Sequence, residues 1–533
     1  MSMYTHKITV LLAAILFVCY SSRAQNNSNI DVIHYRFEIT ITDHSDTING
    51  TASITCKVIK DAASFSFDLG TVDSSGKGME VISLLNKNKH LPFHHHNNRL
   101  LVRLPADVKK GDSMLLVIIY KGIPADGLII GQNIFNKRTF FADNWPNRAR
   151  YWIPCNDIPA DKAGIEFLIT APQHYGIVSN GIKTDERLIS DGTKLTHWKE
   201  DVPLPTKVMV FGAADFRVSD AAFAGDIPVT SWVFADQKGF HDYELARDIL
   251  QFYINYIGPY GYKKLANVQS KTRFGGMENA GAIFYFERSV QGKGSLENLL
   301  AHEIAHQWFG DMVTESDFKH LWLSEGFATY MTDLYIESKY GIDSLHSNLN
   351  DHRKAVIDFA TNSGSPVIDT STNLMQLLNA NAYQKGGWVL HMLRIKTGDA
   401  LFQKIIRAYY KKFAGINAST EDFIATAAMI SGKDLGSFFR QWLYKPGLPV
   451  LATTWKATAS GKKIVVTVEQ KQDGLFSFPV ELLIKTEGGN LIKTVSIKER
   501  RTIINLALRS RVTEIQTDPN FKLLYQAYEI KKE

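Results

Sequence analysis

Cysteine is scarce in this chain of 533 residues, which contains only three. They are too few to hold so long a chain together as a disulfide scaffold. None has the spacing of a zinc ribbon either, so any bound metal must take histidine and carboxylate ligands. An excess of one charge is also missing, because 60 Lys and Arg residues stand against 54 Asp and Glu residues and leave a net charge of +6. This surplus is far smaller than a nucleic-acid-binding surface requires, and we expect no nucleic-acid partner.

Apolar runs that could cross a membrane as a helix are lacking as well, since about 18 uninterrupted apolar residues would be needed. The longest run, residues 8–20, follows Lys7 and precedes a small-residue cleavage site at residues 22–24. This arrangement predicts a secretory signal over residues 1–24 and an exported protein, periplasmic or extracellular, with no transmembrane segment in the mature chain. The alternatives are an uncleaved anchor, for which the run is short, and a lipid-bearing Cys19, which no small residue precedes.

The composition is that of a globular protein, with 45% hydrophobic and 21% charged residues, and the length of 533 residues calls for several domains. Over residues 25–217, short alternating runs between Gly, Asn, Asp and Pro turns predict an all-β domain. Over residues 218–448 the apolar period lengthens to three or four, which predicts a mostly helical domain. Alternation returns over residues 449–533 and predicts a small β-sandwich. The expected fold class is therefore multidomain α and β.

The chemistry concentrates in the helical domain at residues 302–306, which read His-Glu-Ile-Ala-His. Two histidines four residues apart point about 40° apart on a helix, so His302 and His306 can reach one zinc ion. Apolar residues at every fourth position from Leu296 to Trp308 form a stripe roughly opposite, which lets one face pack while the other faces a cleft. A random chain of this composition would contain the pattern about 0.02 times, which argues against a chance pair.

A catalytic zinc ion usually takes three protein ligands and keeps its fourth position for water. Glu325 lies 19 positions after His306, at the start of the next long helical pattern. An acid in that position can merely interact with the helix dipole. Beside the histidine pair it becomes the missing carboxylate, so the sequence predicts a zinc site formed by His302, His306 and Glu325.

Here the sequence resembles the aminopeptidase N-like family of gluzincin zinc metallopeptidases, over nearly the whole mature chain. Besides the zinc pattern, residues 275–279 match the family's GxMEN motif, about two dozen residues upstream of His302. Weaker agreements occur at residues 31–35, 154–159, 179–181 and 439–442. The resemblance implies an N-terminal β domain, a thermolysin-like catalytic domain and a C-terminal small β-sandwich, without the large C-terminal helical domain of many relatives.

The resemblance also implies catalytic roles in peptide hydrolysis. Glu303 is implied as the general base and acid, which takes a proton from the zinc-activated water and returns it to the leaving amine. Tyr383 is implied as the donor that stabilises the tetrahedral oxyanion. A tyrosine in an apolar helix is usually a packing residue. The Lys-Gly pair that follows in Tyr383-Gln384-Lys385-Gly386, and the spacing of 58 positions after Glu325, match the family instead.

The GxMEN segment separates two kinds of peptidase. We expect all of its residues to bind substrate, namely Gly275, Gly276, Met277, Glu278 and Asn279. A carboxylate fixed beside zinc can pair with a free α-ammonium group, so Glu278 favours an aminopeptidase acting on peptides with a free amino terminus over an endopeptidase. The glycines let the substrate backbone approach as an added edge strand. The family usually has alanine where this chain has Gly276.

Other positions depart further from the family. Asp143 stands where many members have a Gln or Glu that contacts the substrate amine, so we expect it to bind substrate, although a turn-capping aspartate is an equally good interpretation. The three histidines at residues 94–96 are expected in a solvated loop rather than a metal site. Cys56 and Cys155 could pair in an oxidising compartment, which the sequence leaves open.

The resemblance therefore implies a zinc metalloaminopeptidase with one Zn²⁺ per chain, and the predicted signal implies that it is secreted. Two other functions are alternatives. The first is epoxide opening at the same zinc, as in a leukotriene hydrolase of the family, but that relative ends in a helical domain where this chain has alternating strands. The second is a catalytically inactive, peptide-binding member of the fold. The presence of every expected metal ligand argues against this alternative.

Overall fold

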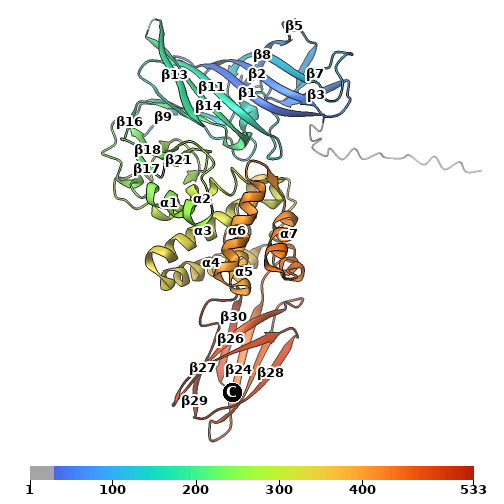
Figure 1. The fold of residues 1–533 in the computed structure, drawn as a ribbon, viewed down its shortest axis with the longest axis vertical. Coiled ribbons are helices and arrows are strands. Elements are labelled where there is room, and N and C mark those ends of the chain that lie inside the picture. Colours follow the sequence, from blue (N-terminus) through green and yellow to red (C-terminus); the bar gives the residue numbers. More distant parts are fainter. Residues whose placement is uncertain (1–28, 191, 533) are drawn as a thin grey trace, which may run out of the picture.

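A computed structural model describes residues 29–190 and 192–532. The predicted secretory signal over residues 1–24 lies outside the described residues. Figure 1 shows three parts stacked along the long axis: a β-rich part, a middle part that carries the helices, and a second β-rich part. Within the described residues, the helices of the middle part are followed by strands only, so the predicted fold class is confirmed. The predicted domain boundaries stay predictions.

The N-terminal part is built from strands in which buried and exposed residues alternate, as in β1 (Ile30–Thr40). Its largest sheet has the order β13-β14-β11-β1-β2-β8-β4-β5, with β1 parallel to β11 and antiparallel to β2. The other strands of this sheet are β2 (Ile48–Val58), β4 (Gly78–Asn86), β5 (Lys89–His90), β8 (Ser113–Ile123), β11 (Lys162–Pro172), β13 (Ile182–Ser190) and β14 (Thr193–Pro205).

Two smaller sheets complete the N-terminal part. One has the order β12-β15-β10-β9, from β9 (Leu128–Gln132), β10 (Arg138–Ala142), β12 (Gly176–Ser179) and β15 (Phe211–Ala214). The other has the order β3-β7-β6, from β3 (Ser64–Asp68), β6 (Phe93–His96) and β7 (Arg99–Arg103). The histidines at residues 94–96 therefore lie on a strand, and the expectation of a loop was wrong. His95 Nε2 is 3.0 Å from the carbonyl oxygen of Leu69.

The middle part begins with a six-stranded sheet before its helices. The order is β16-β18-β19-β21-β20, with β17 beside β18, so β20 (Gly276–Met277) is an edge strand. The other strands are β16 (Phe216–Val218), β17 (Ala222–Ala224), β18 (Ile227–Phe234), β19 (Leu265–Ser270) and β21 (Ala282–Phe286). A two-stranded pair, β22 (Thr314–Glu315) and β23 (Asn417–Ala418), lies among the helices. The helices are α1 (Ala246–Tyr256), α2 (Glu297–His306), α3 (Trp322–Tyr340), α4 (Ile342–Asn362), α5 (Gly386–Thr397), α6 (Asp399–Phe413), α7 (Thr420–Ser431) and α8 (Gly436–Phe439).

The C-terminal part consists of two sheets, in line with the predicted small sandwich. One has the order β28-β25-β24-β30, from β24 (Val450–Ala457), β25 (Lys463–Gln470), β28 (Arg501–Ala507) and β30 (Gln526–Lys532). The other has the order β27-β26-β29, from β26 (Phe478–Thr486), β27 (Gly489–Ile497) and β29 (Val512–Thr517). Buried side chains from both sheets, including Val466 and Leu482, form one apolar cluster.

Apolar packing continues across the borders between the parts. The core of the helical region extends to Phe478 and Leu524 of the C-terminal part, and the core of the N-terminal part includes Phe284 on β21. Among the described residues, no helix combines the length and the apolar character needed to cross a membrane. Cys56 and Cys155 are both buried free thiols, which answers the question that the sequence left open.

Candidate active site

Two packed helices bring the predicted metal ligands together. His302 and His306 lie one turn apart on α2, and Glu325 lies in the first turn of α3. The face of α2 opposite the histidines is buried in the core, where Leu300 and Ile304 are fully covered. The predicted apolar stripe is confirmed, and its burial leaves both imidazoles facing α3.

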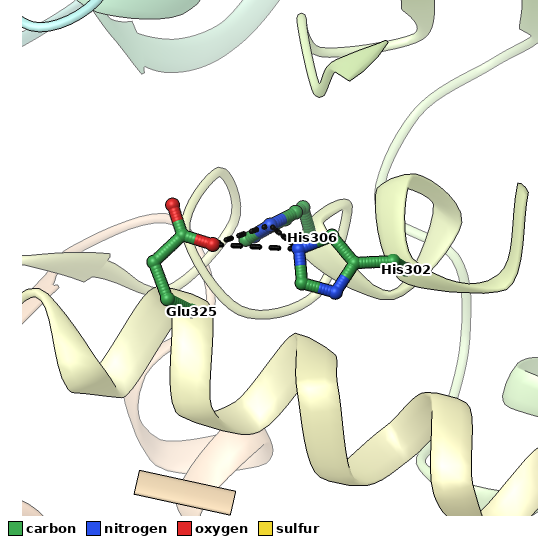
Figure 2. A group of neighbouring side chains, drawn as sticks. All are labelled: His302, His306 and Glu325. Atoms are coloured by element: carbon green, nitrogen blue, oxygen red, sulfur yellow. Dashed lines mark hydrogen bonds and ion pairs between the residues drawn. The ribbon is translucent and has the colours of Figure 1, made fainter. Parts of the chain in front are cut away.

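The three ligand atoms form the close triangle that Figure 2 shows. Glu325 Oε2 lies 3.4 Å from His302 Nε2 and 3.2 Å from His306 Nε2, and the two Nε2 atoms are 3.1 Å apart. Atoms bound tetrahedrally to zinc stand about 3.3–3.6 Å apart, because each bond is about 2.0–2.2 Å long. Glu325 Oε2 is also buried and accepts no hydrogen bond from the described residues. The spacing, the donor types and this unsatisfied oxygen all fit a zinc ion.

The imidazole of His306 is oriented by its second nitrogen. His306 Nδ1 lies 3.0 Å from the carbonyl oxygen of Phe309 and 3.1 Å from Ser324 Oγ. A carbonyl oxygen can only accept, so Nδ1 donates to Phe309 and carries the hydrogen. Nε2 is then left as the atom that faces the triangle, which is the arrangement that histidine ligands of metals usually have.

The charges of the site act on one another. Burial alone would raise the pKa of Glu325, but His306 and His302 hold it well below its usual range. Burial lowers the pKa of His302, which leaves this imidazole neutral at pH 7 with a lone pair to donate. Burial also opposes the charging of His306, but Glu325 and Glu278 outweigh this effect and raise the pKa of His306 to about 10. A metal ion at the triangle would therefore displace a proton from His306.

Glu303, the predicted general base, lies in the same pocket and is buried. Burial raises its pKa to about 8, with the charge of His306 acting in the opposite direction. A Cβ atom at Gly276 would stand 2.4 Å from the carboxyl carbon of Glu303. The glycine leaves room for this carboxylate, which is a physical reason for the departure from the family's usual alanine.

The GxMEN segment is divided between the pocket and its support. Gly276, Met277 and Glu278 line the pocket, whereas Gly275 and Asn279 do not. The carboxylate of Glu278 lies within 4.8 Å of a nitrogen of His306 and a carboxylate oxygen of Glu303. Its Oε1 atom is buried and has no hydrogen-bond partner among the described residues. A buried, unpaired carboxylate beside the ligand triangle is a place where a cationic group would be stabilised.

Tyr383 lies in the pocket on the π-helix η6 (Asn381–Lys385), which directly precedes α5. Its ring stacks against the imidazole of His302 at 5.9 Å with an interplanar angle of 15°. The turn is anchored at both ends, because Asn381 Nδ2 donates to the carbonyl oxygen of Ser365 and Lys385 Nζ donates to that of Gly447. Burial, followed by the charges of nearby carboxylates, raises the pKa of Tyr383 well above its usual value, so the phenol keeps its proton.

Asp143 does not line the pocket, and the expectation that it binds the substrate needs correction. Its side chain is fully buried. One carboxylate oxygen accepts from Arg148 Nη2 at 2.8 Å, and the other accepts from the backbone N–H of Arg273 at 3.1 Å. These bonds hold Asp143 beneath the segment that leads into the GxMEN motif.

Three apolar side chains complete the pocket and were not predicted: Trp145, Phe274 and Leu378. Each lies close in sequence to a residue that was predicted, because Trp145 follows Asp143, Phe274 precedes Gly275 and Leu378 precedes Tyr383. That proximity was the only signal available, because a single apolar residue in a loop does not reveal which space it lines.

Comparisons with known proteins agree with this arrangement. The description "Peptidase family M1 domain" matches residues 241–442, and "Peptidase M1 N-terminal domain" matches residues 32–208. A leucyl aminopeptidase of Saccharolobus solfataricus is 26% identical over 466 residues, which are 82% of this chain and 57% of that protein. Aminopeptidase M1-C of Oryza sativa subsp. japonica is 30% identical over 325 residues, which are 58% of this chain and 37% of that protein. The chain thus spans about half the length of the curated relatives it matches.

Solved structures show the same fold. The crystal structure of an M1 zinc metallopeptidase from Deinococcus radiodurans aligns with a TM-score of 0.68 at 24% identity, over 79% of this chain and 95% of that one. The two family matches lie on the N-terminal β part and on the part that holds the ligand triangle. The chain belongs to peptidase family M1, as an aminopeptidase N-like member of the gluzincins.

Proposed function

We propose that the chain is an exported, zinc-dependent aminopeptidase that removes the first residue from peptides with a free amino terminus. The observation that carries this proposal is the unpaired, buried carboxylate of Glu278 beside the triangle of His302, His306 and Glu325. A peptide whose α-ammonium group pairs with Glu278 presents its first peptide bond to the triangle. A peptide with a blocked amino group would leave Glu278 buried without a partner, which disfavours its binding.

His302, His306 and Glu325 would hold one zinc ion. When bound, the ion supplies a Lewis acid and lowers the pKa of a coordinated water. Glu303 then accepts a proton from the attacking water and passes it to the leaving amine. Burial raises the pKa of this carboxyl above its usual range, and a base whose pKa lies closer to neutral pH suits both steps.

Tyr383 would donate its phenolic hydrogen to the oxyanion that forms at the scissile carbonyl. Its raised pKa keeps that hydrogen in place at neutral pH. The stack with His302 and the anchored turn hold the ring, so little reorganisation is needed during the reaction. The edge strand β20 offers backbone groups along which the peptide could lie as an added strand.

Export is part of the proposal and rests on the predicted signal over residues 1–24. Expression with and without these residues, followed by fractionation and N-terminal sequencing, tests it. Recovery of the intact N-terminus in the cytosolic fraction would contradict export.

The activity is tested with purified protein and aminoacyl reporter substrates. We expect release of the reporter, loss of activity with a chelator and recovery with added zinc. An acetylated reporter should be cleaved far more slowly than the free amine. Equal cleavage of the two would contradict the role of Glu278, and full zinc occupancy without turnover would identify an inactive, peptide-binding member of the family.

A further inference from the structure

The aromatic wall of the pocket is formed by Trp145 and Phe274, which stand side by side next to the ligand triangle. Their ring centroids are 5.9 Å apart with an interplanar angle of 85°, an edge-to-face contact. Trp145 also contacts Phe318 edge-to-face at 6.1 Å. Trp145 is buried at 2% exposure, whereas Phe274 is half-buried and offers part of its ring to the pocket.

A buried ion pair holds both members of this wall. Arg148 Nη2 donates to Asp143 Oδ1 at 2.8 Å, and Arg148 Nε donates to the carbonyl oxygen of Trp145 at 2.7 Å. The guanidinium carbon of Arg148 also lies 5.9 Å from the ring centroid of Phe274. The second oxygen of Asp143 accepts from the N–H of Arg273, the residue directly before Phe274. The carboxylate of Asp143 thus holds the wall in two ways, through the side chain of Arg148 and through the backbone of Arg273.

The ion pair between Asp143 and Arg148 is shielded from solvent. Asp143 is 0% exposed and Arg148 is 8% exposed, so water competes little for their hydrogen bonds. Asp126 is the outer partner of the same arginine, at 3.2 Å from Arg148 Nη1, but its side chain is 27% exposed. Because solvent screens such a partner, we expect Asp143 rather than Asp126 to hold Arg148 in place.

We propose that the Asp143–Arg148 pair determines the specificity of the site, because it positions the Trp145–Phe274 wall against which the first side chain of the peptide lies. This inference rests on the proposed aminopeptidase function and names its substrate class: peptides that begin with a large apolar or aromatic residue. The pocket beside the ligand atoms has a volume of only about 50 Å³, too small for a large side chain, so this side chain lies along the rings at the mouth of the pocket. Asp143 acts as a positioning residue and does not contact the amino group.

Glycyl and phenylalanyl reporters separate this role from a contact with the amine. Both carry the same α-ammonium group, but only the second has a side chain that can lie on the wall. In Asp143→Asn we expect kcat/KM for the phenylalanyl reporter to fall about tenfold, mainly through a higher KM, and the glycyl value to change less than about twofold. The matched control Asp126→Asn, which removes the outer partner, should change either value less than about twofold. An equal fall for both reporters, or no fall for either, would overturn the proposal.

A second variant keeps the proposal testable if Asp143→Asn does not fold. Phe274→Ala removes a half-buried ring and leaves the ion pair in place, and it should cause the same selective loss. Binding supplies a readout besides turnover: phenylalanine amide and glycine amide are titrated calorimetrically into the zinc-loaded Glu303→Gln variant. If phenylalanine amide binds this variant more tightly than glycine amide but the unsubstituted protein turns over no reporter, the proposed activity is refuted and the wall is supported. Turnover with equal binding of the two amides would overturn the wall and leave the activity standing.

Discussion

The buried ion pair between Lys207 and Glu315 links the N-terminal part to the middle part, and its contribution to stability can be measured. Lys207 lies on the 3₁₀ turn Thr206–Val208 and Glu315 on β22, and their side chains are 2% and 0% exposed. Nζ lies 2.5 Å from Glu315 Oε1. Burial alone would lower the pKa of Lys207, but the charges of Glu315 and Glu278 outweigh it and raise this pKa. Lys207 is therefore charged at pH 7, whereas burial raises the pKa of Glu315 and the charge of Lys207 lowers it.

Lys207→Met keeps the length of the side chain and removes its charge. Glu315 would then be a buried carboxylate without its ion-pair partner, in a region that already contains Glu278 and Asp311. Breaking a buried pair in this way costs about 3–5 kcal/mol, because the remaining ion keeps its desolvation penalty. The double variant Lys207→Met/Glu315→Leu removes both charges and should recover most of this loss.

Urea unfolding at pH 7, followed by tryptophan fluorescence, measures the effect. With an m-value of about 3 kcal/mol/M, the single variant should lower the midpoint by about 1–1.7 M. Lys183→Met is the control, because its pair with Glu186 is exposed to solvent, and its midpoint should not move. A shift below about 0.3 M for Lys207→Met, or a double variant as unstable as the single one, would refute the reasoning.

Three further results are expected. Glu303→Gln keeps the size of the side chain but cannot accept a proton, so kcat should fall by about 10²–10⁴ while mass spectrometry still finds one zinc per chain; an active variant would contradict the proposed base. In Gly326→Ala the new Cβ would stand 2.8 Å from Gly386 Cα and 3.1 Å from the carbonyl oxygen of Ala382, both backbone atoms, so α3 must move away from the turn of Tyr383. We expect a loss of about 1–3 kcal/mol in unfolding free energy together with a lower kcat. In Gly364→Ala the Cβ would meet nothing within 4 Å, so neither the unfolding free energy nor kcat should change. Equal effects of the two variants would refute the packing argument. Finally, burial raises the pKa of Asp161 to about 7. The folded state therefore holds this proton more tightly than the unfolded chain, and stability should fall as pH rises from about 4 to 7. Asp161→Asn should flatten that part of the stability profile, and an unchanged profile would contradict the assignment.

The local part of the site could be predicted because its geometry is contained in short spacings. Two histidines four residues apart can only lie on the same side of a helix, and the buried stripe opposite them turns that side outward. The positions of His302 and His306 therefore follow from residues 296–308 alone. Predicting Glu325 as a ligand required a second helix. The apolar pattern after Glu325 predicted that helix, and the structure places Glu325 in the first turn of α3.

Other elements could not be predicted, because their environment comes from distant segments. The sheet over residues 216–286 consists of short apolar runs that periodicity alone cannot distinguish from helix, and it was included in a mostly helical domain. Tyr383 was expected on an ordinary helix but lies on a π-helix. There the close contact between the backbones of Gly326 and Gly386 lets α5 approach α3.

Sequence by itself determined the family resemblance and predicted the three metal ligands and the general base, since each prediction depends on residue identity and on spacing within one or two helices. Tertiary structure alone decided the role of Asp143. Its position in the sequence suggested a contact with the substrate, whereas the fold buries it between Arg148 and a backbone N–H 130 positions further along the chain. A carboxylate acts on whatever donor lies within hydrogen-bond distance, and only the folded chain determines which donor that is.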